Sequence, residues 1–276
     1  MEISAKTRLL TVIGDPVAHS LSPAMHNAAF RALGLDAVYV ALRVPAELLA
    51  QVLAMQTATH GAGNVTVPHK EAVERSVTRK TDVCARVGAC NTFWIEDGAL
   101  VGDNTDVFGV TAALAGIGGG ASGQGARWLV VGTGGSARAT AIAAADLGAT
   151  LWVRSRNESR AKEFAAWSNS IGVRTQVANG AVEVDVAINA TPLGLAGNDP
   201  LPVDLNHIPG VRTALDLVYA PGETRWVHEL RKRGIAAADG REMLVQQGAA
   251  AFERFFPGTN APKEVMRAAV HRALRV

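Results

Sequence analysis

The chain has 276 residues, enough for two hydrophobic cores at roughly 150 residues per domain, and its 48% hydrophobic and 19% charged residues exclude a disordered or collagen-like protein. The net charge of +2 and the absence of a basic run longer than Arg231-Lys232-Arg233 argue against nucleic acid as a partner. Because the sequence has no signal-like apolar segment and no uncharged apolar stretch of roughly 18 residues, we expect a cytoplasmic protein that does not span or bind a membrane.

The first strand and helix are predicted near the amino terminus. Residues 9–13 form an apolar run that ends at a Gly-Asp-Pro sequence, which is typical of a strand followed by a turn. Ser22 and Pro23 then predict a helix start, with Ser22 as the N-cap and Pro23 at the first helical position. Gly34 is expected to end this helix.

Two further strand and helix steps follow in the same half of the chain. Residues 38–44 predict a strand, and Pro45 opens another helix. Residues 64–67 predict a third strand that stops at Pro68, because proline cannot serve a central hydrogen-bonded ladder. Lys70 follows directly, and its position by itself is typical of a solvated surface lysine.

A hairpin and a long helix come next. Residues 91–95 and 100–102 predict two strands joined by a turn at 96–98, and we expect this hairpin to form a sheet edge. Residues 105–117 predict a helix that connects two domains. The glycine-rich segment 118–125 is interpreted as a flexible surface connection rather than a ligand site.

The second half predicts a doubly wound parallel sheet. It starts with a continuous apolar strand at residues 128–131, of the kind that is buried on both faces. Helical stretches at 159–168 and 224–233 separate the later strand patterns, which lie at residues 151–153, 173–177, 184–189 and 214–218. Such a βαβ rhythm is typical of a Rossmann-like domain.

Beyond Gly240 the chain is helical, with an interruption at PGTNAP, and these helices can pack back on the first domain. The predicted fold class is therefore α/β, with two domains and a cleft between them. Residues 1–104, completed by 240–276, form the expected substrate domain, and residues 105–239 form the expected nucleotide domain.

A glycine-rich turn marks a nucleotide site. The sequence VVGTGGSARA places Gly132, Gly134, Gly135 and Ala137 between an apolar strand and an alanine-rich helix. In this context backbone N–H groups can meet a pyrophosphate at the positive end of the helix. The alternative is a tight turn whose glycines serve packing alone.

The next strand favours NADP over NAD. An NAD site needs a carboxylate about 20 residues beyond the first glycine to bind the ribose hydroxyls. Here Arg154, Ser155 and Arg156 stand in its place, and a guanidinium matches a 2′-phosphate. The alternative is that both arginines simply face water.

Lys70 and Asp106 form a candidate proton-transfer pair. Asp106 lies in GDNTD at the start of the connecting helix, where the helix dipole favours a carboxylate, so capping is its purely structural explanation. If both side chains face one cleft, the lysine beside the carboxylate suits proton transfer. Cys84, Cys90 and the scattered histidines match no metal or disulfide spacing, so we expect no metal and two buried thiols.

Eight motifs in order resemble the shikimate/quinate dehydrogenase family over nearly the whole chain. The resemblance rests on HSLSP, NVTVPHK, GACNT, GDNTD, GTGGSARA, INATPLG, DLVYAP and MLVQQ. It implies reversible hydride transfer between NADPH and the ring ketone of 3-dehydroshikimate, giving shikimate, by a monomer or homodimer. Each motif is weak alone, but their shared order makes coincidence a poor explanation.

The resemblance also implies roles for single residues. Lys70 and Asp106 would be catalytic. Ser20, Ser22 and Tyr219 would bind the substrate carboxylate, and Thr66, Asn91, Asp106 and Gln247 the ring hydroxyls. The cofactor would be bound by Gly132, Gly134, Gly135, Ser136, Ala137, Arg154, Ser155, Arg156, Thr191, Leu217 and Gly240. His26 and His69 are interpreted as structural.

One motif departs from the family pattern. The family's NADP loop commonly reads Asn-Arg-Thr, whereas this chain has Ser155-Arg156-Asn157. Three alternatives therefore stay open: an NAD-dependent quinate or quinate/shikimate dehydrogenase, a non-catalytic protein that senses metabolites in the same cleft, and two α/β domains with no small-molecule site.

Overall fold

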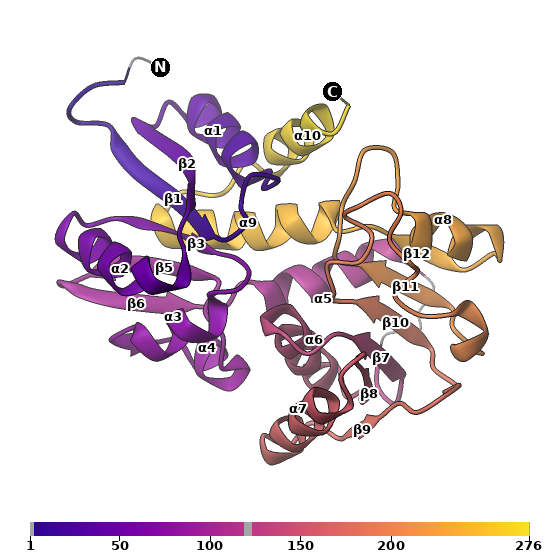
Figure 1. The fold of residues 1–276 in the computed structure, drawn as a ribbon. Helices are drawn as coiled ribbons and strands as arrows, with labels where there is room; N and C mark the ends of the chain where they lie inside the picture. Colours follow the sequence, from indigo (N-terminus) through magenta and orange to yellow (C-terminus); the bar gives the residue numbers. More distant parts are fainter. Residues whose placement is uncertain (1–2, 119–122, 276) are drawn as a thin grey trace. The chain divides into compact units, whose positions relative to one another are not determined.

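The computed structural model describes residues 3–118 and 123–275, which form two compact units of mixed α/β structure (Figure 1). Unit 1 comprises the described residues up to Thr105 together with Leu244–Leu274, and unit 2 comprises Asp106–Met243. The expected α/β fold class is confirmed. The interpretation of segment 118–125 falls on residues 119–122, outside the described part. Over the described ranges, no helix is long and apolar enough to cross a membrane.

Unit 1 contains a mixed six-stranded sheet. Strand β1 pairs in parallel with β2 and β3, whereas β5 runs antiparallel to both β3 and β6. The carboxyl ends of β1, β3 and β6 therefore lie at the same edge as the amino end of β5. The order across the sheet is β2 (Ala37–Arg43), β1 (Arg8–Gly14), β3 (Ala62–Val65), β5 (Thr92–Glu96), β6 (Ala99–Asp103) and β4 (Arg79–Lys80).

Six helices accompany this sheet. Helix α10 packs against α1, and on α9 the ring of Phe252 lies 6.0 Å from that of Phe30 on α1. Most of α9 thus belongs to unit 1, although it follows unit 2 in the sequence. The helices are α1 (Ser22–Leu33), α2 (Leu49–Ala58) after a 3-10 turn at Ala46–Leu48, α3 (Lys70–Ser76), α4 (Asp82–Val87), α9 (Arg241–Phe255) and α10 (Lys263–Ala273).

The structure corrects the predicted start of α1 and confirms its end. Ser22 is the first helical residue instead of the N-cap, which is Leu21 and makes no side-chain capping bond. The fixed φ of the adjacent proline suffices to start the helix. Gly34 ends it in the left-handed conformation at φ +65°.

Two other predictions about unit 1 were wrong. Strand β3 ends at Val65, so Thr66 and Val67 lie in a turn despite being β-branched. Lys70 consequently opens helix α3. The hairpin does not form the sheet edge, because β4 pairs with β6 beyond it. A two-residue exposed strand carries no hydrophobic period that a sequence could reveal.

Unit 2 contains a parallel six-stranded sheet with the doubly wound order. Strand β7 lies between β10 and β8, so the chain leaves β7 on one side and later returns on the other. All carboxyl ends share one edge. The order is β12 (Ala236–Ala238), β11 (Thr213–Asp216), β10 (Val186–Asn189), β7 (Arg127–Val131), β8 (Thr150–Arg154) and β9 (Thr175–Val177).

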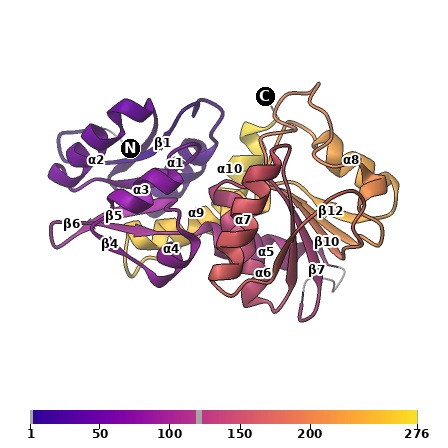
Figure 2. The same cartoon turned by 60° about the horizontal axis from the view of Figure 1, so that its bottom comes forward.

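The helices of unit 2 pack on this sheet. Helix α6 contacts β7 and β8, and α7 contacts β8 and β9 (Figure 2). Helix α8 buries Trp226, Val227 and Leu230 in the main apolar cluster with sheet residues such as Leu129. The bounds are α5 (Asp106–Ile117), α6 (Gly135–Asp146), α7 (Glu158–Ser170) and α8 (Arg225–Lys232), with a 3-10 turn at Leu205–His207.

Candidate functional site

The predicted substrate residues of unit 1 gather at one sheet edge. Ser20 and Ser22 follow the carboxyl end of β1, Thr66 follows β3, and Asn91 directly precedes β5. The Thr66 N–H donates to the carbonyl of Ile13 at 2.8 Å, which joins the turn after β3 to β1. Polar side chains from three distant segments therefore lie on one rim.

Lys70 is held at this rim by its backbone. Its carbonyl accepts the N–H of Cys90 at 2.8 Å, so the first turn of α3 lies beside the residue that precedes Asn91. The neighbouring His69 is buried, and its ring nitrogen lies 2.6 Å from the carbonyl of Val44. The half-buried Lys70 side chain thus projects from a fixed backbone.

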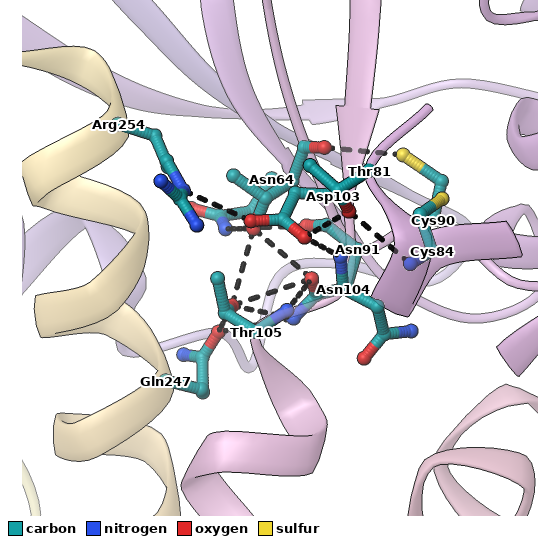
Figure 3. A network of polar contacts seen from close by, with 11 residues as sticks. Asn64, Thr81, Cys84, Cys90, Asn91, Asp103, Asn104, Thr105, Gln247 and Arg254 are labelled. Atoms are coloured by element: carbon teal, nitrogen blue, oxygen red, sulfur yellow. Dashed lines mark hydrogen bonds and ion pairs between the residues drawn. The ribbon is translucent and has the colours of Figure 1, made fainter. Parts of the chain in front are cut away.

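Asn91 lies in a buried polar network (Figure 3). Its Oδ1 accepts the backbone N–H of Thr105 at 2.8 Å and the hydroxyl of Thr92 at 3.0 Å. Its Nδ2 lies 3.0 Å from Thr105 Oγ1 and 3.4 Å from Gln247 Oε1. Two predicted substrate residues, Asn91 and Gln247, are thereby brought together.

The same network contains residues that the sequence analysis missed. Asp103 is buried, and its carboxylate accepts hydrogen bonds from Thr81 Oγ1 at 2.5 Å and the Asn104 N–H at 2.8 Å, and pairs with Arg254 Nε at 2.9 Å. This ion pair ties α9 to the end of β6, seven residues from Gln247. The only available signal was the acidic residue that ends an apolar strand pattern.

The two serines lie next to each other. The N–H of Ser22 donates to Ser20 Oγ at 3.3 Å, and Ser22 is buried while Ser20 is half-buried. Asp106 and Tyr219 belong to unit 2. Asp106 is the buried first residue of α5, and Tyr219 is a half-buried residue after β11.

The predicted cofactor residues of unit 2 also share one edge. Gly132, Arg154, Thr191, Leu217 and Gly240 each lie at or just after the carboxyl end of a different parallel strand. This is the edge at which doubly wound sheets bind nucleotides, where β7 and β10 diverge.

The glycine-rich turn after β7 leaves room for a ligand. Gly132 has φ +114°, and an added Cβ would lie 2.8 Å from the carbonyl oxygen of Ala190, so only glycine fits there. An added Cβ on Gly134 would meet no atom within 4 Å, so the chain itself leaves the space above this residue open. Gly135 and Ser136 open helix α6, and Ala137 is fully buried beneath them. The turn thus fits a pyrophosphate.

The two arginines after β8 differ. Arg154 is half-buried and donates to the carbonyl of Gly180, and burial lowers the pKa of its guanidinium. Arg156 is exposed and makes no hydrogen bond or ion pair with any residue that the structure describes. Ser155 Oγ accepts the N–H of Asn157 at 3.2 Å, and Asn157 caps helix α7. Arg156 is therefore the better placed partner for a phosphate.

Asn189 organises the remaining part of this edge and was missed by the sequence analysis. Its Oδ1 accepts the hydroxyl of Thr191 at 2.7 Å, and its carbonyl accepts the N–H of Leu217 at 2.9 Å. Its Nδ2 donates to Asp216 Oδ1 at 2.8 Å. An added Cβ on Gly240 would lie 2.4 Å from the carbonyl of Leu217, so close packing explains this glycine.

Buried groups away from these edges carry structural roles. His26 stacks on Tyr39 with ring centroids 4.4 Å apart, and burial lowers its pKa to about 3, so it stays neutral. Cys84 and Cys90 are both buried free thiols. Within residues 3–118 and 123–275, no group of three or more His, Cys, Asp or Glu side chains is placed to hold a metal ion.

Comparison with known proteins gives consistent matches over the whole chain. Residues 12–93 match the model of the shikimate dehydrogenase substrate binding domain, and residues 240–271 match that of the shikimate 5'-dehydrogenase C-terminal domain. The shikimate dehydrogenase (NADP(+)) of Archaeoglobus fulgidus is 40% identical over 96% of this chain and 98% of its own. That of Thermosynechococcus vestitus is 37% identical over 99% and 98%.

A solved structure is similar over the same extent. Shikimate 5-dehydrogenase from Thermus thermophilus, in complex with NADP(H) and shikimate, superposes with a TM-score of 0.85 and is 35% identical. The match covers 96% of this chain and 99% of that chain.

Proposed function

The chain belongs to the shikimate dehydrogenase family, and we propose that unit 1 binds shikimate and unit 2 binds NADP in the reversible reduction of 3-dehydroshikimate to shikimate. The protein is an NADP-dependent oxidoreductase, and its relatives favour neither a quinate enzyme nor a silent sensor. The observation that carries the assignment of residues is the fixed position of Lys70 beside Asn91 at the polar rim of unit 1.

In this proposal unit 1 supplies most of the substrate contacts. Ser20 and Ser22 donate hydroxyl hydrogen bonds to the substrate carboxylate, together with Tyr219 from unit 2. Thr66, Asn91 and Gln247 bind the ring hydroxyls with Asp106. Such a site rejects analogues that lack a hydroxyl, because its own buried polar groups would then stay unpaired.

Lys70 manages the proton. NADPH, when bound, supplies the hydride that reduces the ring ketone. The ammonium of Lys70 gives one proton to the oxygen that becomes the hydroxyl, and the neutral amine takes it back when shikimate is oxidised. Asp106 orients this lysine and accepts a ring hydroxyl.

The cofactor is assigned to the carboxyl edge of the unit 2 sheet. The turn of Gly132, Gly134 and Gly135 and the start of α6 at Ser136 and Ala137 would hold the pyrophosphate through backbone N–H groups. Arg156 would pair with the 2′-phosphate, with Arg154 and Ser155 supporting its loop. Thr191, Leu217 and Gly240 would line the nicotinamide end.

Steady-state rates with shikimate and quinate, each with NADP and NAD, test this function through the nicotinamide absorbance. The pair of shikimate and NADP is expected to give the highest kcat/KM. A higher value for quinate with NAD would contradict the assignment, as would tight shikimate binding in calorimetry without any turnover.

The finer assignments of setting are also proposals. A near-neutral charge and the absence of basic clusters support action on small molecules alone, in the cytoplasm, by a monomer or homodimer. Light scattering of the purified protein would contradict the assembly by showing a trimer or larger particle.

A further inference from the structure

A line of buried side chains in unit 1 leads to Asn91, beginning at Tyr39. The Tyr39 hydroxyl donates to Asn64 Oδ1 at 2.6 Å. Burial raises the pKa of Tyr39 well above its ordinary value, so this hydroxyl keeps its proton. Because Oδ1 accepts from Tyr39, the amide group of Asn64 has one orientation, with Nδ2 on the other side.

The next two hydrogen bonds run in the same direction. Asn64 Nδ2 donates to Thr92 Oγ1 at 3.0 Å, and the Thr92 hydroxyl, having accepted there, donates its single proton to Asn91 Oδ1 at 3.0 Å. The backbone N–H of Thr105 also donates to Asn91 Oδ1. Since a backbone N–H can only donate, Asn91 must present Nδ2 on its other side.

Gln247 is oriented from its own helix. Its Nε2 donates to the carbonyl of Leu244 at 2.9 Å, and a carbonyl can only accept. Gln247 Oε1 therefore faces the network, 3.4 Å from Asn91 Nδ2 and 3.5 Å from Thr105 Oγ1. A donor from the residue before β5 and an acceptor from α9 thus meet at the rim (Figure 3).

We propose that this directed chain, Tyr39–Asn64–Thr92–Asn91, sets the substrate selectivity of the site by fixing Asn91 as a donor and Gln247 as an acceptor. The inference rests on the proposed function, in which both residues bind ring hydroxyls. Tyr39, Asn64, Thr92 and Thr105 are then positioning residues that need not touch the substrate.

The chemistry of the donor and acceptor pair selects a hydroxyl. A hydroxyl can accept from Asn91 and donate to Gln247 at the same time, whereas a protonated amine can only donate and a hydrogen atom can do neither. An ammonium in this position leaves the Asn91 N–H facing a positive charge. The site should therefore prefer shikimate over an amine analogue by about 10²-fold or more in kcat/KM.

The first test uses shikimate and the two analogues in which one or the other unoxidised ring hydroxyl is replaced by an amine. For at least one position we expect the stated preference in the parent enzyme. Asn91→Asp keeps the acceptor for Thr105 but replaces the donor by a carboxylate, which favours an ammonium. This variant should move the preference toward that amine by at least about tenfold.

The second test concerns the remote part of the chain. Thr92→Val removes the relay hydroxyl at nearly constant volume, and Thr92→Ser retains it. The preference for shikimate over the amine should fall by about threefold to tenfold in the valine variant and return in the serine variant. The KM for NADP, whose proposed site lies in unit 2, reports whether each variant is folded.

The outcomes separate this inference from the proposed function. A parent enzyme that does not turn over shikimate refutes the function itself. An active parent that accepts both amines as well as shikimate, or an Asn91→Asp variant that loses equally on all substrates, overturns the selectivity inference. If Thr92→Val leaves the preference unchanged, the directed chain is refuted.

Discussion

The two sheet edges of this molecule form their sites in different ways. At the rim of unit 1, the predicted substrate residues are side chains that other side chains orient, as the bonds from Tyr39 to Asn91 show. At the edge of unit 2, the turn at Gly132 works through backbone groups and the space that absent side chains leave. Selectivity for a ring with several hydroxyls needs oriented donors and acceptors, whereas a pyrophosphate needs only close approach of N–H groups.

A buried aspartate ends a strand in each unit, and the contrast extends to these two. Asp103 at the end of β6 pairs with the guanidinium of Arg254 at 2.9 Å. Asp216 at the end of β11 is bonded by neutral donors, from Asn189, Thr224 and the backbone of Val218. Burial without a cationic partner among the described residues raises the pKa of Asp216 to about 6.

The largest expected effect tests whether side chains carry the chemistry of unit 1. Lys70→Ala should lower kcat by about 10²–10⁴-fold while the far-ultraviolet circular dichroism and melting temperature stay unchanged, because general acid–base help is lost without loss of packing. Lys162→Ala is the matched control, since this exposed lysine pairs with Glu158 one helical turn away. A near-parental kcat for Lys70→Ala would make it a surface residue.

The second prediction concerns the stability of unit 2. A carboxyl whose pKa rises from 3.8 to about 6 on folding binds its proton more tightly when folded, so stability falls as pH rises between these values. The full cost is present above about pH 6 and amounts to about 3 kcal/mol. Replacing Asp216 by Asn should flatten this part of the profile of unfolding free energy against pH.

Urea unfolding at a series of pH values measures the difference. Asp97→Asn, at a side chain that is 88% exposed in the turn of the β5–β6 hairpin, provides the control and should follow the parent profile. An Asp216→Asn profile parallel to that of the parent would show that this carboxyl does not titrate as described.

The third prediction separates the two arginines. Arg156→Gln should raise the KM for NADP by about tenfold and leave that for NAD nearly unchanged, since only the 2′-phosphate loses its partner. Arg154→Gln should instead affect both cofactors alike, because its guanidinium contacts the Gly180 carbonyl. Equal effects of Arg156→Gln on both KM values would remove the stated basis for NADP preference.

The smallest expected effect distinguishes two glycines of one turn. Gly132→Ala should destabilise the protein by about 1 kcal/mol or more, because a Cβ would meet Ala190 at positive φ. Gly134→Ala has space for its methyl group and should retain the parental melting temperature, while its KM for NADP rises. A stable Gly132→Ala protein would contradict the close approach described here.

Local patterns explain what the sequence could predict. The strand before Gly132 and the helix after it are neighbours in the chain, and the hairpin follows from Asp97 and Gly98, both at positive φ. Thr66 was placed in a strand because its β-branched pattern says nothing of where pairing stops. The orientation of Asn91 was beyond the sequence, because its partner Gln247 lies 156 residues away. Amide direction depends on such distant partners.

The division of the chain between the units has a consequence for the order of protein synthesis. A ribosome makes Asn91 and Thr105 first, then all of Asp106–Met243, and only afterwards the segment Leu244–Leu274 with Gln247 and Arg254. Since domains fold as units while synthesis proceeds from the amino terminus, the nucleotide half can fold on the nascent chain ahead of its older neighbour. The rim that selects the substrate is completed last, by a helix that arrives after the parallel sheet is whole.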